Sequence, residues 1–166
     1  MDTVLIVRLI DVLNNETVLY EGILKLSKNK TDAIVEGKVS ELESITRLEQ
    51  SMIVKLGKLE EEREELVEKL AVQLHVKASD ITLTNLERQF AGEQAVKLKS
   101  CRDTFPRLIH DVSYANELNA KLIRNSLDYI DFSINILTNA GSTGNNYSNS
   151  GQSSDLKKRN FFDVKL

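Results

Sequence analysis

The first part of the chain has the periodicity of a long helix. Apolar residues recur there at intervals of seven, some with a second apolar residue four positions later: Leu5, Leu9, Val12, Leu19, Ile23, Leu26 and Ala33. Glu16 and Lys30 interrupt this seam. Gly37 follows at a position where helices commonly end, because glycine enters the left-handed backbone region without a Cβ clash. The pattern predicts a helix over residues 3–35.

A second apolar seam begins directly after Gly37 and continues to near His75. Its members keep the three- and four-residue steps of a helix: Leu42, Ile45, Met52, Leu56, Leu59, Leu66 and Leu70. Ser40 and Glu43 form a possible capping box, so we expect the helix to begin at or just before Ser40. Two long helices joined by a tight turn fold back on one another, which predicts an antiparallel hairpin roughly 50 Å long.

The predicted hairpin also determines which residues of its two helices face one another. Pairing about Gly37 places residue i near residue 74 minus i, so Glu16 lies within reach of the long side chain of Arg63. We expect this ion pair to fix the register of the hairpin. It adds little stability, because desolvation of the two charges offsets most of their attraction.

A third long helix is predicted over residues 93–139, after a connector without a helical stripe. Within the connector, Thr84 and Glu87 offer another capping box. The first half of the third helix carries one apolar stripe: Leu98, Cys101, Phe105, Leu108, Val112 and Ala115. Pro106 lies inside this helix, and we expect it to kink the helix and not to split it. The fold class is therefore all-α, a long antiparallel helical hairpin plus a third helix in a three-helix, coiled-coil-like bundle.

The second half of the third helix has more apolar surface than one packing face needs. The first seam becomes polar at Asn119, Ser126 and Ser133. A second stripe appears beside it, with steps of four, three, four and three residues: Ile123, Leu127, Ile130, Ile134 and Leu137. A two-helix hairpin covers one side of such a helix, and an exposed apolar patch usually marks a site for a partner, here an amphipathic helix. Alternatively, the connector, the tail or a second copy buries the stripe.

The last part of the sequence differs in composition from the rest. Residues 141–154 are rich in Gly, Ser and Asn, which predicts a flexible, disordered linker, because such a segment cannot bury enough surface to offset its ordering entropy. We therefore expect a helical domain over residues 1–140 and a tail over 141–166. The tail ends in a basic patch followed by Phe161 and Phe162, a possible docking tip that has too few basic residues for stable membrane binding.

Composition and charge exclude several classes of function. One Pro, no Trp and few aromatic residues disfavour a β-sandwich or barrel, and a net charge of −3 argues against a nucleic-acid surface. One Cys and two His assemble no metal cage, no disulfide framework and no nucleophile–base pair, so we expect neither an enzyme nor a cofactor. Cys101 lies on the apolar stripe as a core residue. No signal peptide or membrane span is apparent, which predicts a cytoplasmic protein.

Three segments resemble one family. Lys30–Gly37, Leu59–Arg63 and Asn116–Ile130 resemble the flagellar export chaperones of the FlgN type, and the helical layout matches over roughly residues 3–139. Lys38 and the long linker depart from the family pattern.

The resemblance implies a small cytoplasmic chaperone that is not an enzyme. It would bind the unfolded C-terminal segments of flagellar hook-associated (hook–filament junction) proteins and deliver them to the flagellar export gate. In that family the substrate site lies toward the C-terminal helix, so its positions correspond to Ile123, Leu127, Ile130, Ile134 and Leu137. The alternative is a structural coiled-coil adaptor or homodimer without an export role, in which the same stripe mediates self-association.

Overall fold

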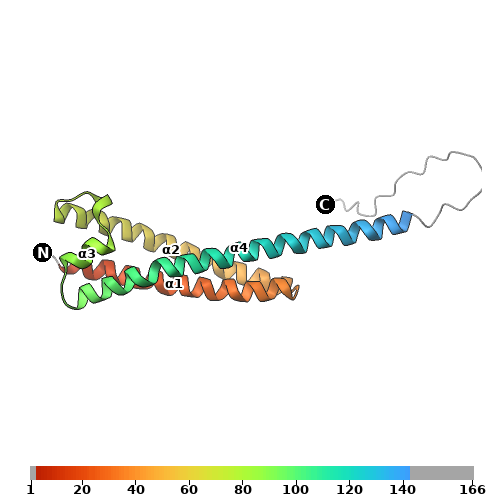
Figure 1. Ribbon diagram of the computed structural model, residues 1–166, viewed down its shortest axis with the longest axis horizontal. Helices are drawn as coiled ribbons and strands as arrows, with labels where there is room; N and C mark the ends of the chain where they lie inside the picture. The colour runs from red at the N-terminus through yellow and green to blue at the C-terminus, as the bar shows by residue number, and fades with distance from the viewer. Residues whose placement is uncertain (1–2, 143–166) are drawn as a thin grey trace, which may run out of the picture. The chain divides into compact units, whose positions relative to one another are not determined.

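The computed structural model describes residues 3–142, and every regular element in this range is helical (Figure 1). The elements follow in the order α1 (Thr3–Val35), α2 (Val39–Leu74), a short 3₁₀ turn (Ala78–Asp80), α3 (Leu83–Gln89) and α4 (Glu93–Ser142). The all-α class and the bounds of the first helix are confirmed. The chain divides into two units, Met1–Asp128 and Tyr129–Leu166, and the last part of α4 belongs to the second.

A tight turn joins α1 to α2. Gly37 has a φ of 67°, the left-handed conformation expected at the end of α1, and the backbone N–H of Lys38 donates to Ala33 O at 2.9 Å. The predicted capping box of Ser40 with Glu43 is wrong. The helix begins at Val39, so Ser40 already lies in its first turn, and the capping position is held by Lys38 without a side-chain bond. Lys38 instead pairs with Glu36 and, at 3.7 Å, with Glu41.

The register of the hairpin agrees with the prediction. Arg63 Nε donates to Glu16 Oε1 at 3.1 Å, although Glu16 is almost fully buried. Lys30 pairs with Glu49 nearer the turn. The polar residues that interrupt the seam of α1 are therefore paired across the hairpin with charged residues of α2.

The connector brings the chain back to the start of α1. His75 ends α2 in the left-handed region, with a φ of 55°. The predicted capping box of Thr84 with Glu87 is wrong, because the cap of α3 lies two residues earlier: Thr82 is extended and its hydroxyl accepts from the backbone N–H of Asn85 at 3.2 Å. Glu87 pairs with Arg102 of α4 instead.

The hydrophobic core lies where the N-terminal half of α1 meets the end of α2, α3 and the start of α4. Its buried members come from all four helices: Ile6, Leu9, Ile10, Val12, Leu13, Leu66, Leu70, Leu86, Leu98 and Cys101. Burial raises the pKa of the Cys101 thiol, as expected for a core residue and not for a nucleophile.

Within residues 3–128, α4 runs parallel to α1. Successive contacts advance along both helices together, from Asn14 with Cys101 to the edge-on ring pair of Tyr20 with Phe105. The same helix continues through Pro106 without a break, which excludes a split at that residue. None of the helices in the described part of the chain combines the length and apolar character needed to cross a bilayer.

Candidate functional site

The predicted stripe lies entirely on α4 and is exposed. Ile123 and Leu127 belong to the first unit, and Ile130, Ile134 and Leu137 belong to the second. Their exposed fractions range from 37% for Ile123 to 73% for Leu137. We call these five residues the apolar stripe. The alternative in which another part of the same chain buries the stripe finds no support among the described residues.

Another set of large side chains lies on a different side of α4. Most of them are exposed, from 38% for Leu118 to 72% for Tyr129, and Leu122 is half-buried. We call this set the aromatic face: Tyr114, Leu118, Leu122, Tyr129, Phe132 and Ile136. A third side of α4 is charged and exposed, with Glu117, Lys121, Arg124, Asp128 and Asp131. The C-terminal half of α4 therefore presents two apolar surfaces and one charged surface.

A polar seam separates the apolar stripe from the aromatic face. It consists of Asn119, Ser126 and Ser133, at intervals of seven residues. The hydroxyl of Ser126 donates to Leu122 O at 2.9 Å, and that of Ser133 donates to Tyr129 O at 2.8 Å. Both hydroxyls are thus bonded within α4 itself and require no partner from outside.

Asn119 joins α4 to α1 through a buried hydrogen-bonded layer. Its Nδ2 donates to Ser27 O at 2.8 Å, and its Oδ1 accepts from Thr31 Oγ1 at 2.7 Å. Ser27 Oγ is also 3.2 Å from Asn116 Oδ1 and 3.4 Å from Glu49 Oε1. Toward the tip of the hairpin, α4 is held to α1 by polar groups that have specific partners.

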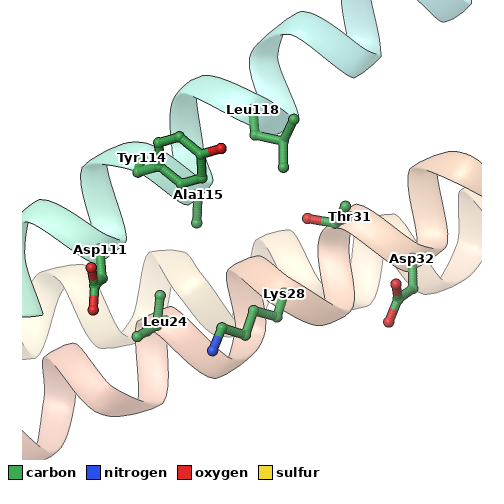
Figure 2. Close-up of a pocket in the computed structure, with 8 residues that line it drawn as sticks. All are labelled: Leu24, Lys28, Thr31, Asp32, Asp111, Tyr114, Ala115 and Leu118. Carbon is green, nitrogen blue, oxygen red and sulfur yellow. The ribbon is translucent and has the colours of Figure 1, made fainter.

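A cleft of about 430 Å³ opens between α1 and α4 beside this layer (Figure 2). Leu24 and Thr31 of α1 face Ala115 and Leu118 of α4, and the Tyr114 ring lies on the α4 side. Three charged side chains complete the lining: Lys28, Asp32 and Asp111. The cleft is mainly apolar, and it begins at the same Tyr114 and Leu118 that start the aromatic face.

Within residues 3–142 no group of three or more His, Cys, Asp or Glu is arranged to hold a metal ion. Burial raises the pKa of Glu16 despite the neighbouring Arg63, and Glu16 Oε2 is buried without a hydrogen-bond partner among the described residues. Phe161 and Phe162, the predicted docking tip, lie outside the described residues.

Comparison with known proteins identifies the family. A family model described as "FlgN protein" matches residues 1–155. The chain belongs to the FlgN family. FlgN proteins are flagellar export chaperones and not enzymes, and they work in the cytoplasm, so the general role expected from the sequence is confirmed.

One curated relative is itself without an assigned role. The chain is 27% identical over 129 residues to the "Uncharacterized protein YvyG" of Bacillus subtilis (strain 168), and the match covers 78% of each chain. No solved structure matches. The FlgN assignment thus gives the class of activity, while the residues that perform it have to be argued from this chain.

The sequence indicated the apolar stripe but not the surfaces around it. In the sequence, Leu122, Tyr129 and Ile136 form a seven-residue series beside the polar positions of the first seam, and Phe132 lies outside this series. A signal was present in the four-residue steps from Tyr114 through Leu118 to Leu122, which place these side chains on one side of a helix. The cleft could not be found in this way, because it depends on how α1 and α4 pack.

Proposed function

We propose that this FlgN-family chaperone works in the cytoplasm, binds the C-terminal segments of flagellar hook-associated proteins through the apolar stripe, and delivers them to the flagellar export gate. The supporting observation is the exposure of all five stripe residues: Ile123, Leu127, Ile130, Ile134 and Leu137. Monomeric proteins seldom leave a continuous apolar surface of this kind uncovered, and such surfaces usually bind a partner.

The energetics suit capture and later release. An amphipathic client helix on the stripe removes apolar surface from water, which contributes about 25 cal/mol per Å² before other costs are subtracted. A client segment that is unfolded when free loses conformational entropy as it binds. The net affinity is therefore moderate, and the export machinery can recover the client without having to break a permanent complex.

Calorimetry with two stripe variants tests the proposed site. The ligand is the C-terminal segment of a hook–filament junction protein encoded in the same genome, titrated into wild type, Ile130→Asp and Ile134→Asp. A carboxylate at either position replaces an apolar contact with a charge that the client would have to desolvate, so we expect at least tenfold weaker binding. Lys121→Asp on the charged side of α4 is the matched control and should bind within about twofold of wild type.

The possible outcomes distinguish an error in the proposed client class from an error in the proposed binding site. If wild type binds no junction-protein segment, the proposed client class is wrong. If wild type binds and both stripe variants bind equally well, the stripe is not the site. Sedimentation equilibrium of the free protein addresses the structural alternative, since we expect a monomer at micromolar concentration and a homodimer would assign the stripe to self-association.

A further inference from the structure

The apolar stripe and the aromatic face together occupy too much of α4 for one partner helix. Successive residues of an α-helix are rotated by about 100°. On this basis the stripe is centred about 60° to one side of Ser126 and the aromatic face about 80° to the other side. The two sets together span an arc of about 220°, whereas the apolar face that one helix presents to a partner is about 100° wide.

The seam between the two sets continues a line that already packs between helices. Asn119, Ser126 and Ser133 extend the seven-residue series of Leu98, Phe105 and Val112. In the first unit this line faces the hairpin, because Phe105 contacts Tyr20 and Asn119 bonds to Ser27 and Thr31. Farther along α4, Ser126 is exposed. Small side chains with internally bonded hydroxyls allow helices to approach closely on both sides of the seam.

We infer that the apolar stripe and the aromatic face together bind a pair of helices supplied by one client segment. This segment folds back on itself, so that its two helices lie on either side of the polar seam of α4. One client helix packs on the apolar stripe and the other on the aromatic face, so that the C-terminal half of α4 forms a three-helix arrangement with its client. The inference rests on the proposed function and specifies the form that the client takes when bound.

A second copy of the chain has too few exposed apolar helices to cover both the apolar stripe and the aromatic face. A second copy offers its own α4 as one exposed apolar helix, because its α1 and α2 already pack against each other and against the start of α4. One helix covers either the stripe or the aromatic face and leaves the other in water. The charged side of α4, which includes Lys121, Arg124, Asp128 and Asp131, lies opposite the polar seam and stays in contact with water when both client helices are bound.

The bound length of the client follows from helix geometry. The stripe, from Ile123 to Leu137, rises about 22 Å and matches a partner helix of about 15 residues, whereas the aromatic face, from Tyr114 to Ile136, rises about 34 Å and matches one of about 23 residues. Two such helices and a short turn require about 40 to 43 client residues. A client that binds as a single helix needs about half that length.

Binding measurements with aromatic-face variants and client fragments test the inference. The probe is the last 45 residues of a junction protein from the same genome, and the variants are Tyr129→Asp and Ile136→Asp, with Ile130→Asp as the stripe reference and Lys121→Asp as the control. We expect each aromatic-face variant to weaken binding at least tenfold, and each half of the segment alone to bind at least a hundredfold more weakly than the whole. Complexes should contain one client per chaperone.

The results that would contradict the two-helix inference differ from those that would contradict the proposed function. If Ile130→Asp weakens binding while both aromatic-face variants stay within twofold of wild type, the client is a single helix and the inference is wrong, although the proposed function stands. Two clients per chaperone, or a homodimer dissolved by Ile136→Asp, also overturns it. Circular dichroism checks that the variants keep their helicity, and Tyr129→Ser and Ile136→Ser provide uncharged replacements with the same expected direction.

Discussion

The buried polar layer between α1 and α4 gives a sharp test of how α4 is held. In Asn119→Asp the side chain keeps its shape, but the amide that donates to Ser27 O at 2.8 Å becomes a carboxylate oxygen facing that carbonyl. Thr31 Oγ1 can still donate to the other oxygen. Asn119 is 3% exposed, and Glu49 contributes another carboxylate to the same layer. Among the described residues, Asn119 bonds to Ser27 and Thr31, neither of which carries a charge that could compensate the new carboxylate.

The expected cost combines a lost hydrogen bond with an uncompensated buried charge. A buried group that loses its partner costs about 1–3 kcal/mol, and an unpaired buried charge costs about 3–5 kcal/mol. The Thr31 hydroxyl still donates a hydrogen bond to the new carboxylate and offsets part of this cost. We therefore expect the free energy of unfolding to fall by about 3 kcal/mol at pH 7. Burial raises the pKa of the new carboxyl, and protonation removes most of this loss, so the difference should shrink as the pH falls toward about 4, the pKa of an unfolded Asp side chain.

Urea unfolding followed by circular dichroism measures this difference. Asn125→Asp is the matched control, since it makes the same chemical change at an exposed position of the same helix and should alter stability by less than about 0.5 kcal/mol. Equal effects of the two substitutions at pH 7 would refute the assignment of Asn119 to a buried layer. Asn119→Leu should stay within about 1 kcal/mol of wild type, because Thr31 Oγ1 also bonds to Ser27 O within α1.

Two further predictions concern the hairpin itself. Gly57→Ala should stabilise the protein by about 1 kcal/mol, because the added methyl meets nothing within 4 Å and alanine favours a helix interior; Gly37→Ala should destabilise it by about 1 kcal/mol, because φ there is 67°. Thermal melts of the two variants check these opposite signs, and shifts in the same direction would contradict them. Burial raises the pKa of Glu16, so the folded chain binds this proton more tightly than the unfolded chain, and wild type loses stability as the pH rises from below 4.5 through the raised pKa. Glu16→Gln should lack this loss, and urea titrations at several pH values that run parallel for the two proteins would show that Glu16 carries no such shift.

The helices and their register were predictable because they depend on local patterns. The seven-residue repeats define α1 and α2, and a glycine near the middle of the hairpin is enough to bring Glu16 opposite Arg63. The caps were less predictable. Ser40 and Thr84 each have an acidic residue three positions later, yet the helices start before them, at backbone conformations that Lys38 and Thr82 adopt and that no residue pattern specifies.

The contacts between α1 and α4 could not be read from the sequence. In the sequence Asn119 is only a polar interruption of a seam, and no pattern distinguishes Ser27 from other polar residues. Their hydrogen bond requires the parallel register of α1 and α4, which the connector of residues 75–92 sets through its turns. The exposure of the stripe could not be predicted either, because periodicity identifies an apolar face without showing what covers it.

The parallel alignment of α1 and α4 has a consequence for how the nascent protein acquires its structure. The hairpin closes through three residues between Val35 and Val39, whereas Asn14 and Cys101 are 87 positions apart and Ser27 and Asn119 are 92 apart. Short closures are fast and distant ones slow, because the entropy lost on closing a loop grows with its length. The hairpin can therefore form while later residues are still being synthesised on the ribosome. When α4 emerges, it packs onto a hairpin that is already folded. Refolding experiments should resolve hairpin formation before the docking of α4.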